Sequence, residues 1–480
     1  MAALAAGLGM FLAALDISVN VALPSIRSVL ETDLQTVQWV IVVFIATRAG
    51  LVMGAGSFAD RFGLKLVYLF GTLTYLVSMF CIALSPNLEF VVGFRALQAV
   101  GTGCLYAVSP AIAAEAFPAH RRGLGMGFTA GSQALGMLAG TLGAGFLVQW
   151  SGWEAVFLGR TPFTLAALLL GVWVLRPQAR RGPGIPFDLT GAVTLMEALL
   201  SLVIGLRLGR SAGWTSPAVL LLLLLAPLFL ALFWRTEGRA AWPVLPRELL
   251  RVRGFSVSSA SMFLAHLGVF VIWFIFPFYI SDGLGQSPLI LGVMLALMAS
   301  FNIGFSPVGG WLCDRAGTVP VGTTGLLILA LGLLLMGFLD SSSPLVQVGL
   351  RISIVGAGLG LFQAAAYALM MNSVSAQRFG TASGALSLTQ AFGTVLSVAI
   401  IGGIFTLSND YHLGKLAATG LPLTQQDNLA FILAFQDVFR LGAVIASLGA
   451  VVFMLADLRV SKATALTYSS WRIRRKVRKK

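Results

Sequence analysis

Few residues in this chain could do chemistry, and most of them interrupt long apolar runs. Asp16 lies inside the first run with Asn20 four residues later, so both side chains can share one face of a helix. Poor solvation favours a protonated carboxyl group, whereas a nearby arginine favours the ionised form. Arg95 is the expected partner, because arginine keeps its own proton while it tunes that of a neighbour. The pair predicts a proton-coupling site; the alternatives are that Asp16 bonds a helix end and that Arg95 reaches the outer interface.

Five polar residues are candidates for lining a substrate cavity beside that pair: Asn20, Arg48, Gln98, His266 and Tyr279. Arg48 either competes with Arg95 for the carboxylate, favours acidic or zwitterionic cargo, or pairs with a backbone carbonyl of a neighbouring helix. Gln98 bonds substrate or bridges helices. His266 titrates near neutral pH when unperturbed, so it is either a proton relay or a packing residue. Tyr279 belongs to an aromatic set that could form a wall for an apolar ligand.

The composition explains how these side chains come to be buried. The 480 residues are 58% hydrophobic and only 10% charged, whereas a soluble domain carries about 25% charged residues. Apolar runs long enough to cross a bilayer, roughly 20 residues each, fall near 4–26, 36–56, 67–84, 88–110, 124–148, 155–175, 189–207, 216–234, 255–281, 287–311, 320–339, 345–371, 381–406 and 431–456. The runs are long and do not alternate, so the predicted fold class is an all-α polytopic membrane protein with fourteen transmembrane helices.

The distribution of positive charge predicts the topology. With the N-terminus in the cytoplasm, most of the 32 lysines and arginines fall in cytoplasmic loops or in the basic tail. We therefore expect a multi-pass protein of the plasma membrane with both termini in the cytoplasm and a tail that lies on anionic lipids. In a soluble protein the net charge of +14 would suggest nucleic acid; here it reflects topology, and no nucleic-acid partner is expected.

A short turn recurs between two pairs of apolar runs and indicates two similar halves. Its copies share one spacing of glycines around an Asp-Arg pair: Gly56, Asp60, Arg61 and Gly63, then Gly310, Asp314, Arg315 and Gly317. Internal repetition is typical of transporter folds. The predicted organisation is a six-helix bundle over 1–178, a two-helix insert with linkers over 179–254, a second six-helix bundle over 255–457 and a basic tail over 458–480.

These segments resemble the major facilitator superfamily, and specifically its fourteen-helix drug:proton antiporter branch. The likeness is carried by the turn Gly56–Lys65 and by three further segments: Leu15–Pro24, Arg95–Gly103 and Phe187–Gly191. The resemblance implies the major facilitator fold, with two six-helix bundles and two inserted helices, and it links Arg95 with proton transfer. The fifth helix departs from the branch, because Thr141 stands where a proline usually follows the glycine at 140.

The repeated turn is predicted to act as a gate at the cytoplasmic end. Asp60 and Arg61 would pair with charges or helix ends of the neighbouring half. The second copy, Asp314 with Arg315, would be weaker because no lysine follows it. The small residues of the fifth helix would let helices approach and slide, and the candidates are Gly136, Gly140 and Gly145.

No motif for ATP-driven transport or zinc hydrolysis occurs in the sequence, so we predict neither an enzyme nor a metal or cofactor. The leading hypothesis is a monomer that exports amphipathic or hydrophobic small molecules by alternating access, coupled to protons and embedded in membrane lipids. One alternative is a carrier of lipid, pigment or acidic metabolite, favoured by the buried arginines. Another is a non-transporting membrane sensor or scaffold, which does not explain Asp16 with Arg95.

Overall fold

The fold is described from a computed structural model that defines residues 1–32, 34–37, 39–177, 188–213, 215–241, 243–417 and 422–456. Throughout these residues the regular structure is helical, with no strand. Within these ranges thirteen helices are long and apolar enough to cross a membrane, and the bent first segment can supply a fourteenth. The expected fold class is therefore confirmed. The basic tail lies outside the described residues.

The first span is broken at Asp16. Helix α1, Ala2–Leu15, ends in a short 3₁₀ segment, η1, Asp16–Ser18, before the chain continues as α2, Val19–Val29, with a bend of 40°. A 3₁₀ stretch inside a helix often marks a hinge. The carboxyl group expected in the middle of a helix thus stands at a break in that helix.

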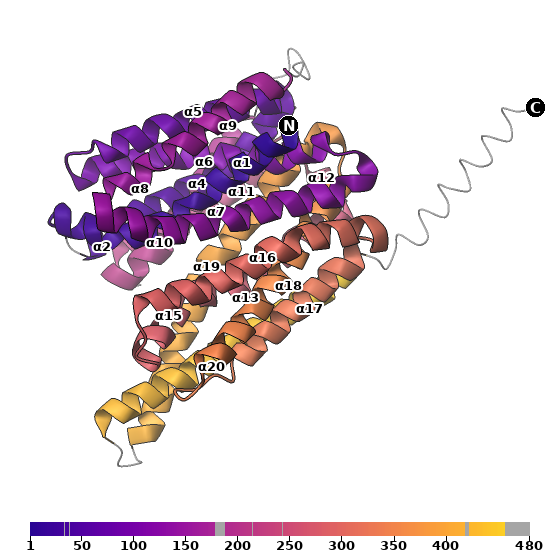
Figure 1. Cartoon of the computed structure of the whole chain (residues 1–480). Coiled ribbons are helices and arrows are strands. Elements are labelled where there is room, and N and C mark those ends of the chain that lie inside the picture. The colour runs from indigo at the N-terminus through magenta and orange to yellow at the C-terminus, as the bar shows by residue number, and fades with distance from the viewer. Residues whose placement is uncertain are drawn as a thin grey trace, which may run out of the picture.

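The remaining helices of the first half form one bundle in Figure 1. They are α3 Leu34–Val37, α4 Trp39–Phe62, α5 Leu64–Ala83, α6 Leu88–Ala116, η2 Ala119–Arg121, α7 Arg122–Ser151, α8 Glu154–Leu158 and α9 Thr161–Val174. The turn between α4 and α5 is made at Gly63, whose φ of 107° is rarely adopted by residues with a side chain. The side chain of Asn87 caps α6 by accepting a bond from the Phe90 amide at 3.1 Å.

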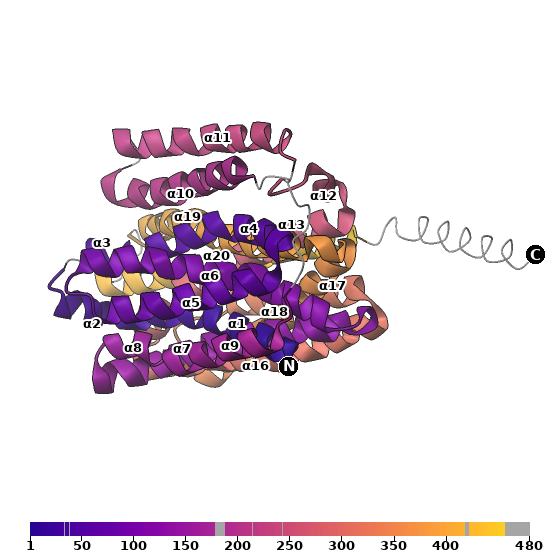
Figure 2. The same ribbon diagram turned by 90° about the horizontal axis from the view of Figure 1, so that it is seen from above.

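The inserted pair forms a layer beside this bundle (Figure 2). It consists of α10, Leu189–Ala212, and α11, Pro217–Glu237, and the short α12, Arg247–Arg251, follows. Helix α10 packs on α4, where a Cβ added to Gly50 would lie 2.7 Å from the side chain of Met196.

The second half forms the other bundle of Figure 1. Its elements are α13 Arg253–Val269, α14 Val271–Phe274, α15 Phe276–Phe278, the π-helical η3 Tyr279–Gly283, α16 Pro288–Ala316, α17 Thr318–Met336, α18 Leu345–Ser373, η4 Ala376–Arg378, α19 Phe379–Leu416 and α20 Leu423–Met454. The seventh span was expected as one run but is divided into α13, α14, α15 and η3. Pro277, which cannot donate to the preceding turn, lies at these breaks.

The most extensive contacts between the two halves are made by two helix pairs, α4 with α19 and α7 with α16. Glycines allow backbone contact at one end of each pair. A Cβ added to Gly56 would collide with the carbonyl of Gly380, and one added to Gly123 would collide with the carbonyl of Gly310. These positions flank the repeated turns, so the end of the bundle that carries both turns is closed.

A proline provides a further contact between the halves, deeper in the bundle. Pro110 lies within α6 and cannot donate to the carbonyl of Tyr106, four residues earlier. That carbonyl instead accepts bonds from the hydroxyls of Ser383 at 3.1 Å and Ser387 at 3.2 Å, both on α19. Such satisfaction of a freed backbone group by a neighbouring helix is what a membrane interior requires.

Candidate functional site

Asp16 lies in a buried network of charged and hydroxyl groups. Its Oδ1 is 2.5 Å from Nη1 of Arg160 and 3.5 Å from Nη1 of Arg95. The same oxygen accepts a bond from the Tyr75 hydroxyl at 3.4 Å, while Oδ2 accepts one from the Thr102 hydroxyl at 2.8 Å. The residue is only 6% exposed. One buried carboxylate is therefore shared by two guanidinium groups, which leaves the three charges with a net charge of +1.

Arg160 makes the shortest contact with Asp16, and the sequence did not indicate this ion pair. Arg160 immediately precedes α9 and is only 3% exposed. Its Nη1 also donates to the Tyr75 hydroxyl at 3.1 Å, and its Nη2 donates to the Ser18 hydroxyl. The available signal was its position next to the apolar run of α9, but such a charge is normally at the interface.

Arg95 is 1% exposed and does not reach an outer interface. Its Nη1 donates to Oε1 of Gln98 at 2.6 Å, its Nε donates to the Val40 carbonyl at 3.2 Å, and its guanidinium carbon lies 4.0 Å from the centre of the Phe44 ring. Gln98 does not belong to the lining of the cavity described next. It holds the arginine in place, which corrects the expectation that it faces substrate.

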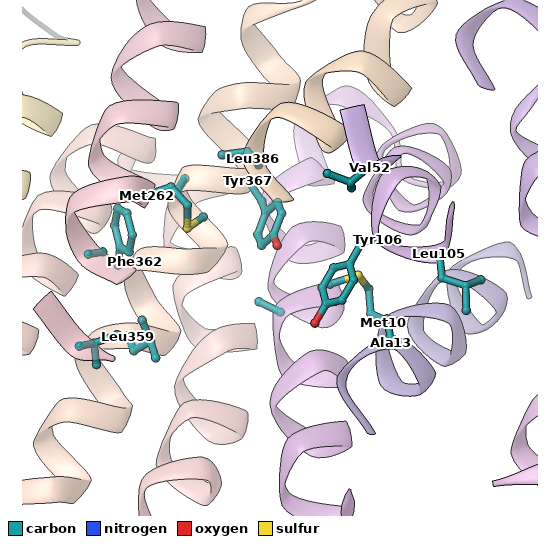
Figure 3. Packing of buried hydrophobic residues seen from close by; sticks show 14 of the residues in the cluster. Met10, Ala13, Val52, Leu105, Tyr106, Met262, Leu359, Phe362, Tyr367 and Leu386 are labelled. Atoms are coloured by element: carbon teal, nitrogen blue, oxygen red, sulfur yellow. The ribbon is translucent and has the colours of Figure 1, made fainter. Parts of the chain in front are cut away.

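A cavity of about 190 Å³ lies between the halves and is bordered by Asp16 and Arg95. Drug-sized ligands usually occupy about 300–1,000 Å³, so the cavity must widen to hold one. Its lining comes from both halves and includes Arg48 of α4 and His266 of α13. Figure 3 shows Tyr106 of α6, also in the lining, and Tyr367 of α18 approaching each other from opposite halves.

Arg48 lies against two aromatic rings at the edge of this cavity. Its guanidinium carbon is 5.0 Å from the centre of the Tyr106 ring and 5.7 Å from that of Phe44. Arg160, rather than Arg48, shares the carboxylate of Asp16 with Arg95. In the part of the chain that the structure describes, no salt bridge includes Arg48.

Of the other residues expected in the cavity, one lines it and one does not. His266 lines the cavity, and its ring contacts the Met262 carbonyl at 3.0 Å through Nδ1 and the Gln390 side chain at 2.9 Å through Nε2. Tyr279 is not in the lining; its hydroxyl donates to the Asp340 carbonyl at 2.8 Å. That expectation was wrong because hydropathy does not specify which way a side chain faces. The side chain of Asn20 lies outside the described residues.

Both repeated turns bind the beginning of a helix in the other half. Asp60 accepts bonds from the backbone amides of Gly380 at 2.6 Å and Thr381 at 2.7 Å, at the start of α19. Asp314 accepts bonds from the amides of Gly123 at 2.8 Å and Leu124 at 2.9 Å, at the start of α7. A carboxylate is stabilised there by free amides and by the helix dipole. We call these two contacts the Asp60 latch and the Asp314 latch.

The arginines of the turns differ in their surroundings. Arg61 is 8% exposed and lies 5.0 Å from the Phe62 ring centre, whereas the exposed Arg315 lies 4.1 Å from that of Trp311. The Asp314 latch was expected to be the weaker one. The hydrogen bonds do not show such a difference, because each latch has two hydrogen bonds of similar length.

The glycines of α7 do not all serve packing. A Cβ on Gly136 would meet the Phe11 carbonyl of α1, and one on Gly140 would lie 2.9 Å from the Leu15 carbonyl. Gly145 has no atom within 4 Å of that position, so its assignment to helix packing was wrong. Close approach of α7 to α1 ends before this point.

A second cavity, of about 430 Å³, lies between α10 and the first bundle. Its lining includes Phe58, Phe70 and Met196, and none of the described residues that line it is charged. Despite its larger volume it offers no group that could move a proton or recognise a charge, so the central cavity is the candidate site.

Two halves of membrane-spanning helices that enclose a partly charged cavity define a membrane transporter rather than an enzyme. The chain belongs to the Major Facilitator Superfamily, whose family model matches residues 6–234 and 258–478. It is 30% identical over 444 residues to the Tetracenomycin C resistance and export protein of Streptomyces glaucescens, covering 92% of this chain and 82% of that protein.

Two further proteins illustrate the similarity. The Multidrug resistance protein Stp of Mycobacterium tuberculosis (strain CDC 1551 / Oshkosh) is 29% identical over 409 residues, covering 84% of this chain and 75% of that protein. Among solved structures, the human organic anion transporter MFSD10 (TETRAN) is similar with a TM-score of 0.65 at 16% identity, over 92% of this chain and 98% of that one. At this identity the likeness concerns the fold alone.

Proposed function

We propose that this protein exports amphipathic small molecules across the plasma membrane by alternating access, driven by protons that bind Asp16. The observation that carries the proposal is the carboxylate of Asp16 at the cavity wall, held by Arg160 and Arg95. Relatives named for antibiotic resistance, multidrug resistance and export support the direction of transport.

The network around Asp16 gives a reason for coupling. While Asp16 is ionised, the two arginines and the Thr102 hydroxyl satisfy it. A proton on the carboxyl group removes both ion pairs and leaves two buried guanidinium groups without their counter-charge, which is unfavourable in a membrane interior. The protonated site is therefore stable only after its helices rearrange. The break at η1 provides a place where α1 and α2 can move separately.

The two latches account for access. Opening the closed end requires Asp60 to leave α19 and Asp314 to leave α7, because each joins one half to the other. By the distribution of arginine and lysine in the sequence we assign this end to the cytoplasm. This conformation is then closed toward the cytoplasm, and the cavity lies beyond the latches.

The test uses inverted membrane vesicles that contain the protein. With an imposed proton gradient, the wild type should accumulate a fluorescent amphipathic dye, and Asp16→Asn should not, because it cannot release a proton. Asp340→Asn is the matched control, since Asp340 is an exposed carboxylate in the loop before α18. Equal uptake by wild type and Asp16→Asn would refute proton coupling. Absence of flux with a broad panel of drugs and lipids would favour the sensor hypothesis.

A further inference from the structure

The charges around the central cavity do not balance. Among the described residues of its lining, Asp16 is the only carboxylate, whereas Arg48 and Arg95 are both cationic. Arg160 stands directly behind Asp16 and contributes a third positive charge. With Asp16 ionised, the four groups carry a net charge of +2.

The two arginines of the lining bracket one aromatic ring. The guanidinium carbons of Arg95 and Arg48 lie 4.0 Å and 5.7 Å from the centre of the Phe44 ring, so they are within about 10 Å of each other. Arg95 is already bound to Asp16, Gln98 and a backbone carbonyl. Arg48 lies against the rings of Phe44 and Tyr106 and beside the Tyr106 hydroxyl, none of which cancels its charge, and it forms no salt bridge with any described residue.

Arg48 is half-buried at the edge of the cavity, and among the described residues it has no counter-ion. A cation at membrane depth without a counter-ion is costly, so it is a candidate for binding the opposite charge. Arginine also presents a planar fork that matches a carboxylate. Apolar and aromatic residues make up much of the remaining lining, including Phe270, Trp273 and Met298. These parts suit a ligand with an apolar body and one acidic group.

Resting on the proposed function, we infer that the substrates of this transporter are organic anions with an apolar ring system, and that Arg48 is the residue that determines this specificity. The acidic group of the ligand binds the guanidinium of Arg48 and is also attracted by the positive charge of the nearby Arg95. The apolar body lies against the aromatic and aliphatic walls between the halves.

The same charges fix the sign of the linkage between ligand and proton. Among the described residues, the charged or titratable groups around Asp16 are Arg95 and Tyr106 of α6, Arg160 before α9 and Tyr75 of α5. Arg48 and His266 belong to the lining of the same cavity. Protonation of Asp16 raises the net charge of the site, so it strengthens anion binding and weakens cation binding. The proton and the anion therefore do not compete for one binding site. Exchange of one for the other then depends on which states, with proton bound, with anion bound or with both, can switch between the two sides of the membrane.

The test compares three probes with the same naphthalene body, carrying a carboxylate, a carboxamide or an aminomethyl group. Binding to the purified full-length protein is measured by fluorescence. The carboxylate should bind most tightly. Arg48→Gln should weaken its binding by roughly 10- to 100-fold, the usual value of a hydrogen bond to a charged group, and should change carboxamide binding by less than about threefold. Arg235→Gln, on the exposed face of α11, is the matched control and should change neither.

A second pair of variants keeps the inference testable if Arg48→Gln unfolds. Arg48→Lys retains the charge and should retain the preference for the carboxylate. Asp16→Asn should bind the carboxylate more tightly than the wild type does, because it removes the only negative charge of the lining. Equal binding of the three probes, equal weakening of all three by Arg48→Gln, or no binding at millimolar concentration would each overturn the inference. The proposed proton coupling fails separately, if Asp16→Asn vesicles pump like the wild type.

Discussion

The two latches make a quantitative prediction about the balance between the access states. Asp60→Asn leaves the side chain with a single, uncharged oxygen. One of the two α19 amides then loses its acceptor, and the second amide donates to a neutral oxygen instead of a charged one. Hydrogen bonds to charged groups contribute about 1.5–3 kcal/mol each, and the helix dipole about 0.3–1 kcal/mol more. We therefore expect a loss of about 3 kcal/mol per latch, or on the order of 100-fold in the ratio of closed to open molecules.

Asp314→Asn should have an effect of the same size, since its bonds to α7 have similar lengths. The latches join different helix pairs and share no residue, so their free energies should add in the double variant. Ligand binding in detergent should change little, because neither carboxylate lines the cavity. Transport should slow, because the closed state becomes rare.

The assay is a distance measurement between spin labels at Ala119 and Ala376, exposed residues just before α7 and α19, in a chain without its native cysteines. The closed protein should give one short distance, each single variant a second longer one, and the double variant mainly the longer one. An unchanged distribution in the double variant would refute the latch mechanism. A change in Asp60→Asn alone would show that the second latch is the weaker, as the missing lysine suggested.

Two further predictions concern single positions. Arg160→Gln removes the shortest contact of Asp16, and breaking a buried ion pair costs about 3–5 kcal/mol. The variant should therefore melt at a clearly lower temperature in detergent and lose proton-driven uptake. Arg160→Lys should recover part of both. Gly140→Leu should lower the melting temperature, because the new side chain would collide with the Leu15 carbonyl. Gly145→Leu should not, because no atom lies close to that position. Equal melting temperatures of the two variants would contradict the packing of α7 on α1.

Much of the architecture could be predicted because hydropathy and repetition report on long segments. Apolar length located the spans, and the repeated spacing of Asp60 and Asp314 indicated a contact with helix ends of the other half. Gly63 and Gly317 were expected at turns, and both have positive φ values, 107° and 91°. These features depend on local chain length and backbone geometry, which the sequence records directly.

What could not be predicted depends on rotation of helices about their axes and on neighbours distant in sequence. Arg160 stands at the start of a helix, where a charge is usually solvated, and only the packing of α8 and α9 on α5 and α1 brings it to Asp16. Gln98 and Tyr279 are polar residues in apolar runs, like the residues that do line the cavity. Their side chains turn toward Arg95 and toward the loop after α17, respectively.

The ion pairs of Asp16 also constrain how the protein is made. Asp16 is synthesised 79 residues before Arg95 and 144 residues before Arg160. When the first span reaches the membrane, its carboxylate has neither partner, and a charge at the centre of a lone helix costs about 2.5–3.5 kcal/mol. The nascent segment must therefore take up a proton or stay hydrated at the insertion machinery until later helices arrive. The residue proposed to move protons in the finished carrier thus also constrains how its first helix enters the membrane.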